Sequence, residues 1–400
     1  MLYFSDQIEV TDELDTLQCH HYKECNADSP SELKAMRGVI ADGTHVLCKS
    51  FGFTPELTTT QVIENSDSLS ELLTQNFKVF DSYEGTLLRL WWDSKNELWR
   101  LSTHRKIDAF FSRWGSDKSY GELFVKYLSL ASNNTKDWAD TLDTSDNPFN
   151  DFTTKLHKHK VYVLLLRSGK ENRVVCNAYE DIKLFIIGTF DKSNDWKWDF
   201  GAKETSLKCP ETAKCSSVSE ITDYVNAVDP YKIQGVVVIT ENGEAYKILN
   251  NEYFKLNNLR GNNPNLIKRY VELRKDQTKG DLEGFLRLYP EHVKLFESFD
   301  KVFADVCNNV FKKYMNRYVR KRVTIAPPEQ FYIMKLVHEQ YIRDKINVSI
   351  QLVEQVMNSQ SAKQLYYIYQ QYIQREEQLG NGNFIPKEDA DKLFEKIKRN

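Results

Sequence analysis

Four hundred residues exceed the length at which a single hydrophobic core usually stops growing, and a 41% hydrophobic share builds a substantial core, so we expect two domains. No apolar run approaches the roughly 20 residues that span a bilayer, and acidic residues stand where a secretory signal would be basic and apolar. We therefore expect neither a membrane-spanning nor a secreted protein. The seven scattered cysteines indicate reduced thiols, which favours the cytoplasm. Cys19, His20, His21 and Cys25 lack two further ligands at finger spacing, so no metal site is predicted.

Up to about residue 260 the pattern is that of strands, short runs rich in Val, Ile, Leu, Tyr and Trp between polar turns. Residues 161–167, 184–190 and 235–240 are apolar almost throughout, as central strands buried on both faces would be. Residues 69–77 and 219–228 show helical spacing. We predict an α+β fold in which helices flank two antiparallel sheets.

Beyond residue 260 the spacing becomes helical, and the Asn- and Gly-rich residues 257–265 mark the predicted domain boundary. Apolar residues there recur at three- and four-residue steps: Phe299, Val302, Phe303, Val306, Val310, Phe311, Ile333, Leu336, Val337, Tyr341, Leu365, Ile368 and Tyr372. The sequence predicts an N-terminal extension over 1–30, a core domain over 31–262 and an all-α domain over 263–400.

The small net charge conceals an asymmetry. Residues 1–265 hold 30 Lys and Arg against 39 Asp and Glu, whereas residues 266–400 hold 24 against 18. Five cations fall within half the circumference of a predicted helix: Lys312, Lys313, Arg317, Arg320 and Lys321. Such a face could follow a phosphate backbone, or it could be ordinary solvated surface. A second basic patch holds Arg105 and Lys106, which either approach RNA or pair with nearby acids.

The most informative motif is S-Y-E-G at residues 82–85, followed by an apolar strand at 86–92 and a second at 98–102. It resembles the K-x-D/E-G element of ATP-dependent ligases and capping enzymes, with serine in place of the nucleophilic lysine. Four more segments follow the order of RNA ligases of the bacteriophage tRNA-repair type, a covalent nucleotidyltransferase family known from phages and large DNA viruses. They are R-G-V-I at 37–40, the strand 161–167 with N-R-V-V at 172–175, Q-G-V-V at 234–237 and Y-K-I-L at 246–249.

The resemblance covers roughly residues 31–260 and implies a nucleotidyltransferase core, of the ATP-grasp-like ligase type, that uses ATP and Mg²⁺. Matching positions are Arg37, Glu84, Asn172, Arg173 and Lys247. The resemblance places Ser82, Glu84, Gly85 and Lys247 at catalytic positions and Arg37, Arg173 and Gln234 at nucleotide-binding ones. At four other positions this chain has a different residue from the family. Ser82 replaces the nucleophilic lysine, Leu166 an acidic residue near the ribose, Gln234 a glutamate that helps hold the metal, and Leu249 a second lysine that contacts the phosphates.

These substitutions affect the chemistry directly. A nucleophilic lysine attacks after its pKa is lowered, whereas serine needs a base, and a metal with paired lysines must offset phosphate charge. Lys78 could be the nucleophile if the alignment is shifted by four residues, but Glu84 and Gly85 would then no longer match the K-x-D/E-G element. We therefore favour a catalytically degenerate module, a pseudoenzyme that binds nucleic acid, RNA above all, or a protein. The alternatives are an active ATP-dependent RNA ligase and a structural or assembly protein of a large DNA virus, in host cytoplasm or virion.

Overall fold

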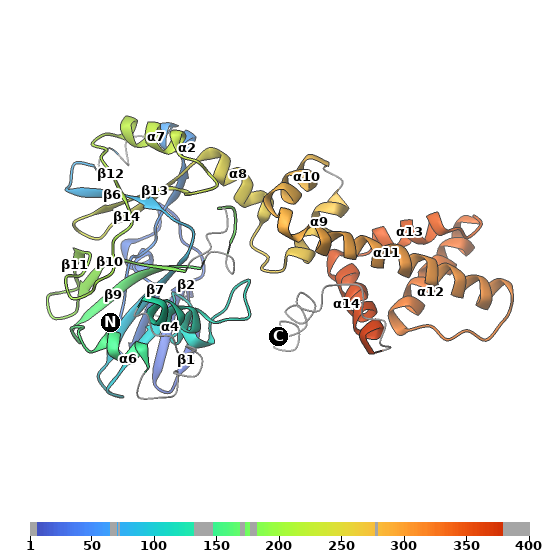
Figure 1. Ribbon diagram of the computed structural model, residues 1–400, viewed down its shortest axis with the longest axis horizontal. Coiled ribbons are helices and arrows are strands. Elements are labelled where there is room, and N and C mark those ends of the chain that lie inside the picture. The colour runs from blue at the N-terminus through green and yellow to red at the C-terminus, as the bar shows by residue number, and fades with distance from the viewer. Residues whose placement is uncertain are drawn as a thin grey trace. The chain divides into compact units, whose positions relative to one another are not determined.

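The computed structural model describes residues 6–64, 70, 73–131, 147–168, 173–176, 182–276 and 279–378. The chain divides into two compact units, Met1–Asn257 and Asn258–Asn400. Strands occupy the first unit and helices fill the described part of the second (Figure 1). The α+β class and the C-terminal helical region are thus confirmed. The position of the domain boundary and the independence of the two parts stay predictions.

The strands of the first unit form three sheets rather than the two we expected. The first sheet is antiparallel and has the order β1 (Ile8–Leu14), β2 (Leu17–Tyr22), β3 (Arg37–Asp42), β4 (His45–Cys48). Residues before 31, predicted as an extension, supply β1 and β2. β1 is partly exposed and β2 is largely buried although it holds two histidines, so neither strand shows a clean alternation of apolar and polar residues in the sequence.

The second sheet is antiparallel and the third contains one parallel pair, β14 with β5. In spatial order the second sheet is β11 (Lys197–Phe200), β10 (Lys183–Asp191), β9 (Lys160–Arg167), β7 (Thr86–Asp93), β8 (Leu98–Ser102). The third is β12 (Thr212–Ala213), β6 (Phe77–Ser82), β13 (Gly235–Thr240), β14 (Ala245–Leu249), β5 (Glu56–Thr58). The predicted buried strands 161–167, 184–190 and 235–240 are confirmed as β9, β10 and β13.

Helices cover the outer faces of the second and third sheets. The helices of the first unit are α1 (Ser31–Lys34), α2 (Thr59–Glu64), η1 (Ala109–Phe111), α4 (Tyr120–Ala131), α6 (Pro148–Thr153), α7 (Val218–Ala227) and α8 (Asn251–Arg260), the last of which crosses the division between the units. α4 and α6 pack on the second sheet, and α2 and α7 on the third. The inner faces of all three sheets share one core, which includes Ile40, Trp91 and Phe80.

The two predicted helices of this unit fare differently. Residues 219–228 do form α7, which Ser217 caps by accepting from the N–H of Glu220 at 3.2 Å. The prediction for residues 69–77 is wrong at its end, because Phe77 begins β6 and residues 73–75 form a turn. Most of its first half lies outside the described residues.

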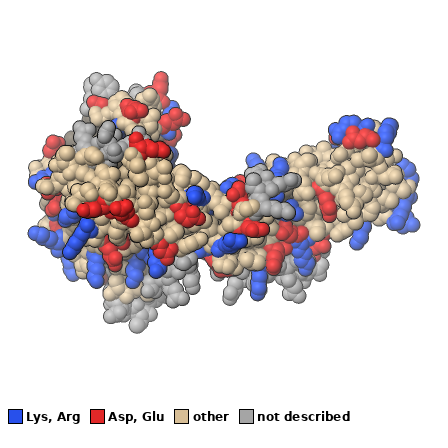
Figure 2. All heavy atoms as spheres, turned by 90° about the horizontal axis from the view of Figure 1, so that it is seen from above, with Lys and Arg blue, Asp and Glu red and all other residues tan. Residues whose placement is uncertain are grey.

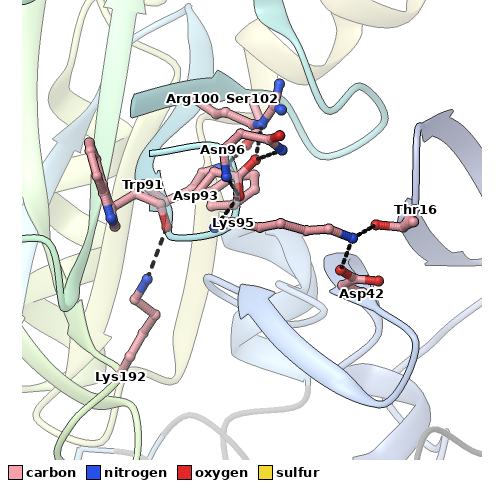
Figure 3. Close-up of polar contacts among 10 residues, drawn as sticks. Thr16, Asp42, Trp91, Asp93, Lys95, Asn96, Arg100, Ser102 and Lys192 are labelled. Carbon is pink, nitrogen blue, oxygen red and sulfur yellow. Dashed lines mark hydrogen bonds and ion pairs between the residues drawn. The ribbon is translucent and has the colours of Figure 1, made fainter. Parts of the chain in front are cut away.

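The β7–β8 hairpin is fixed by a buried carboxylate (Figure 3). Asp93 accepts from the N–H groups of Lys95 and Asn96, from the Asn96 amide and from Arg100 Nε at 2.7 Å. These bonds hold the pKa of Asp93 below its ordinary value against the opposing effect of burial. Lys95 also reaches Asp42 of the first sheet, at 3.2 Å. The hairpin thus joins the first and second sheets.

The second unit is helical throughout its described residues. Its elements are α9 (Leu266–Asp276), α10 (Lys279–Leu288), η2 (Pro290–His292), α11 (Val293–Tyr314), the π-turn η3 (Met315–Val319), α12 (Pro328–Asp344), α13 (Ile350–Ser359) and α14 (Ala362–Gln378). The apolar stripe of α11 packs in the core as predicted, except that Phe311 is only half-buried. The last 22 residues of the predicted all-α domain, 379–400, lie outside the described residues.

No described helix has the length and apolar character needed to cross a membrane.

Candidate functional site

The site begins where β6 ends, at the position of the missing lysine. Ser82 lies opposite Gly235 across the third sheet, and its hydroxyl donates to Gln234 Oε1 at 3.1 Å. The N–H of Gln234 donates to the Ser82 carbonyl at 2.8 Å. Both side chains are buried. The structure therefore brings together two motif positions that lie 152 residues apart.

Gly235 is required by the backbone at this point. Its φ is +143°, and a Cβ there would lie 2.0 Å from the Ile248 carbonyl oxygen of β14. The positive φ and the short distance each exclude a side chain at this position. Glycine therefore lets β13 approach β14 immediately after Gln234. The glycine of the Q-G-V-V motif thus has a structural reason that does not depend on catalysis.

Glu84 lies beside this pair and is fully engaged by hydrogen-bond donors. Its Oε2 accepts from the N–H of Val174 at 3.0 Å. Its Oε1 accepts from the N–H groups of Val175 at 2.6 Å and Cys176 at 3.0 Å, and from the Tyr253 hydroxyl at 3.0 Å. Four donors satisfy the hydrogen-bonding capacity of this buried carboxylate. Glu84 thus ties the end of β6 to the segment 173–176 and to α8.

Tyr253 completes a continuous polar network. Burial and the neighbouring Glu84 carboxylate both raise its pKa, and a hydrogen bond with Gln234 opposes them. Its hydroxyl therefore stays protonated and keeps donating to Glu84. Asn250 positions this residue, because its side-chain oxygen accepts from the N–H of Tyr253 at 3.1 Å and so caps α8. We call Ser82, Gln234, Tyr253 and Glu84 the buried network.

Gly85 and Leu166, at two other motif positions, lie at the start of β7 and in β9. A Cβ on Gly85 would come 2.5 Å from the Leu166 carbonyl oxygen, so close strand approach explains this glycine too. Arg173 is half-buried next to the segment that Glu84 holds. Asn172 lies outside the described residues.

Lys247 and Arg37 converge on a different residue, Glu56. Lys247 Nζ lies 3.2 Å from Glu56 Oε1, and the negative charge of Glu56 also acts on Arg37. Arg37 donates to the Gly52 carbonyl at 3.2 Å and to Thr54 Oγ1 at 2.9 Å, and burial lowers its pKa. The ion pair is partly exposed and contributes about 0–1 kcal/mol. An anion would therefore compete with Glu56 for Lys247 at small cost.

The divalent ion that the resemblance implies does not fit these residues. Mg²⁺ prefers oxygen ligands, chiefly carboxylates. In the buried network the carboxylate is Glu84, whose oxygens both accept from protein donors, and Gln234 is neutral. Nowhere in the described part of the chain are three or more His, Cys, Asp or Glu residues arranged to hold a metal.

A cavity of about 450 Å³ opens on the other side of β6. Its lining residues are Asp81, Tyr83, Arg167, Glu211, Val228, Asp229, Lys232 and Ile233. Asp81 and Ser82 are neighbours on one strand and point to opposite faces. Burial raises the pKa of Asp81, which accepts from the Tyr224 hydroxyl of α7 at 2.8 Å. The cavity is thus separate from the buried network.

Lys78, the alternative nucleophile, shares a face of β6 with Ser82 but lies four residues away. That separation corresponds to about 13 Å along a strand. Its ammonium group lies 4.4 Å from the centre of the Phe200 ring. Among the described residues, no hydrogen bond or ion pair joins Lys78 to the buried network.

The two basic patches differ in their partners. Arg105 forms an ion pair with Glu9 at 2.9 Å, and Lys106 with Asp12 at 2.9 Å, both acids of β1. This is the arrangement expected of ordinary surface. A nucleic-acid role for these two residues has no support in their contacts and stays a prediction.

The five cations of the predicted helical face do not share one regular helix. Lys312 and Lys313 end α11, Arg317 lies in the π-turn η3, and Arg320 and Lys321 follow it. Lys321 has a φ of +53°, so the chain has already left the helix there. The assumed 100° per residue fails at Tyr314. Lys313 donates to Gln330 at 2.7 Å, whereas the other four are exposed.

No protein-family model matches this chain. It is similar to an immediate-early protein ICP-46 homolog of Invertebrate iridescent virus 3, with 27% identity over 303 residues that cover 74% of this chain and 63% of the relative. It is also similar to immediate-early protein ICP-46 of Frog virus 3, with 30% identity over 209 residues, 51% of each chain. The chain thus spans less than two thirds of these curated relatives.

Among solved structures the chain is similar to an archaeal ATP-dependent RNA ligase, with a TM-score of 0.39 and 12% identity over 72% of this chain and 74% of that one. A putative ATP-dependent DNA ligase from Aquifex aeolicus has a TM-score of 0.35 and 12% identity over 84% and 78%. These neighbours have ligase folds, and at these values neither carries an activity over to this chain. The tRNA-repair type expected from the motifs stays a prediction.

Sequence reasoning missed the roles of Tyr253 and of the 174–176 backbone. The motif comparison placed Glu84 at a catalytic position, but three of its four partners are the backbone N–H groups of residues 174–176, and a motif does not indicate which main-chain groups donate. Tyr253 follows the Y-K-I-L motif at 246–249 and is part of none of the motifs. A buried tyrosine usually needs a hydrogen-bond partner, and that requirement was the available clue.

Proposed function

We propose that this protein is a catalytically degenerate, RNA ligase-like module that acts by binding a nucleic acid or a protein rather than by joining RNA ends. The observation that supports it most is the buried network, in which Ser82 donates to the neutral amide of Gln234. An amide oxygen is a hydrogen-bond acceptor but not a base at neutral pH.

Serine at the nucleophile position therefore lacks activation. A hydroxyl attacks a phosphate after a general base takes its proton. The Ser82 hydroxyl points to Gln234, and the next member, Tyr253, is a donor whose raised pKa keeps it protonated. The carboxylate of the buried network, Glu84, is held by four other donors. The buried network thus offers the Ser82 hydroxyl no free general base.

Charge neutralisation is weakened as well. The resemblance implies a metal-holding glutamate where Gln234 stands and a lysine where the buried Leu249 stands. Lys247 is paired with Glu56. Loss of a single oxyanion-stabilising donor typically costs about 10²- to 10³-fold in rate, so two losses together with the missing nucleophile leave no useful ligation.

The charge distribution of the chain supports a role in binding a nucleic acid or a protein. The second unit carries the positive excess, and four exposed cations cluster after α11. Nucleic acid is the partner that such a cluster fits best, through release of counterions from phosphates. A protein with an acidic surface is the other candidate.

The experiment is incubation with α-labelled ATP and Mg²⁺ or Mn²⁺, followed by denaturing electrophoresis. We expect no labelled protein band. A band that survives denaturation and disappears in Lys78→Ala would establish an active enzyme with a shifted nucleophile. Lys160→Ala, which alters a lysine outside the motif set, is the control for a general effect of removing a lysine.

A further inference from the structure

We propose that the end of α11 and the facing part of α12 form a binding platform for single-stranded nucleic acid, built from a ladder of aromatic rings and a cluster of unpaired cations. The proposal deepens the proposed function by naming the ligand class and its place. From the proposed function it takes one element, the expectation that this protein binds nucleic acid.

The ladder consists of three rings in near-parallel contact. The Tyr318 and His338 rings lie 4.1 Å apart with 18° between their planes, and the His338 and Tyr341 rings 6.0 Å apart with 21°. Buried Tyr314 anchors the inner end, where its hydroxyl contacts His338 Nδ1 at 2.9 Å. Tyr341 at the outer end is 41% exposed. A nucleobase can extend such a stack, since every base has a π-face.

The backbone beside the ladder departs from regular helix. η3 inserts a π-turn directly after Tyr314, and Lys321 then adopts the left-handed conformation, which is uncommon for a residue with a side chain. Within α-helices, π-turns occur frequently at functional sites. Here the irregular turn places Tyr318 against α12 and then directs the chain outward.

Cations follow immediately. Arg320 and Lys321 come two and three residues after Tyr318, so their Cα atoms lie within about 11 Å of its Cα. Arg317 lies 5.0 Å from the centre of the Phe331 ring. In the described part of the chain, Lys312, Arg317, Arg320, Lys321 and Arg322 are exposed and none forms an ion pair, in contrast to Arg105 and Lys106.

The local charge is strongly positive. Residues 312–345 contain nine Lys and Arg against three Asp and Glu, a surplus as large as that of the whole stretch 266–400. Of those acids Glu329 is buried against Arg375, and Asp344 pairs with Arg343. Figure 2 shows Lys and Arg side chains gathered at the right-hand end of the helical unit, the end where Figure 1 labels α12 and α13.

These features favour a single strand over a duplex and over an acidic peptide. Bases in a duplex are stacked on one another and cannot stack on a protein ring, whereas unpaired bases can. An acidic peptide would use the cations but would leave the aromatic ladder without a function. The exposed Val323 and Ile325, 101% and 90% accessible, add apolar surface beside the cations.

The test uses fluorescence anisotropy of a labelled single-stranded RNA of about 12 nucleotides, within the usual site size, and a duplex of equal length, with the full chain. We expect tighter binding of the single strand. Tyr341→Ala should weaken it by about tenfold and Tyr341→Phe should retain it, because the ring supplies the contact. Tyr367→Ala, which removes a similarly exposed tyrosine of α14, is the matched control.

The cations are tested by Arg320→Gln, Lys321→Gln and Arg322→Gln together. The log–log salt dependence should flatten by about 0.7 for each lost contact with a single strand. Arg287→Gln, Lys294→Gln and Lys363→Gln together form the control variant, which removes the same charge elsewhere in the unit.

Equal effects of the two triple variants, or no effect of Tyr341→Ala, would overturn the platform while leaving non-catalytic binding intact. Equal competition by poly-glutamate would also overturn it, in favour of an acidic protein partner. A covalent nucleotide adduct would instead contradict the proposed function alone.

Discussion

Replacing Glu84 should destabilise the first unit far more than it changes any binding. Its carboxylate accepts four hydrogen bonds, from three backbone N–H groups and the Tyr253 hydroxyl. In Glu84→Ala these donors lose their acceptor in a buried site. At about 1 kcal/mol for each bond after partial relaxation, the loss in unfolding free energy is about 4 kcal/mol.

Glu84→Gln provides the graded variant. With the amide oxygen at the Oε1 position, the bonds from Val175, Cys176 and Tyr253 persist, and the one from Val174 is lost. The expected cost is about 1–2 kcal/mol. Exposed Glu64→Ala is the control, with a change within about 0.5 kcal/mol.

The assay is urea unfolding followed by tryptophan fluorescence. All seven tryptophans lie between residues 91 and 198, so the signal reports on the first unit alone. In a thermal melt with the same fluorescence signal, the Glu84→Ala melting temperature should be lower by about 8–16 °C. If Glu84→Ala matched Glu64→Ala in stability, Glu84 would not be a structural tether, and its catalytic assignment would regain support.

Three further predictions concern pH, the nucleophile and the domain boundary. Burial lowers the pKa of His20, His21 and His104, so the unfolded chain binds protons more readily. The unfolding free energy of the first unit should therefore be highest above about pH 6.5. Below that pH it should fall by up to about 1.4 kcal/mol per pH unit for each histidine. A urea midpoint that stays constant between about pH 7 and 5 would contradict this prediction. Ser82→Lys alone should not restore ligation of nicked RNA, because the neutral amide and the leucine at the other two positions remain, and any joined product would contradict this. A fragment ending at Gly261 should unfold cooperatively by circular dichroism, because its sheets bury their own core, and a broad, non-cooperative melt would refute the division.

The sequence was sufficient where a residue's environment is set by its neighbours along the chain. The apolar runs of β9, β10 and β13 predicted buried strands, because a strand covered on both faces has no polar alternation to confuse it. Antiparallel pairing of β6 with β13 brings Ser82 and Gln234, which belong to two different motifs, to the same end of the sheet. Both results depend on regular geometry.

Irregular backbone geometry, by contrast, cannot be predicted from such patterns. The basic face was projected from a uniform helix, and the π-turn after Tyr314 rotates and then ends it. Phe77 was assigned to a helix although it starts a strand, because a short apolar run fits either period. The partners of Glu84 are main-chain groups, and every non-proline residue carries the same N–H. Such contacts become visible only in three dimensions.

Binding and ligation measured together on one nicked RNA test the central claim most directly. The native chain is mixed with ATP, Mg²⁺ and a labelled nicked RNA that carries a single-stranded overhang of about 12 nucleotides. Binding is followed by anisotropy, and the same sample is then resolved on a denaturing gel. We expect the RNA to be bound and the nick to remain open. A joined strand would contradict the account, because it requires chemistry that the Ser82 and Gln234 pair cannot perform.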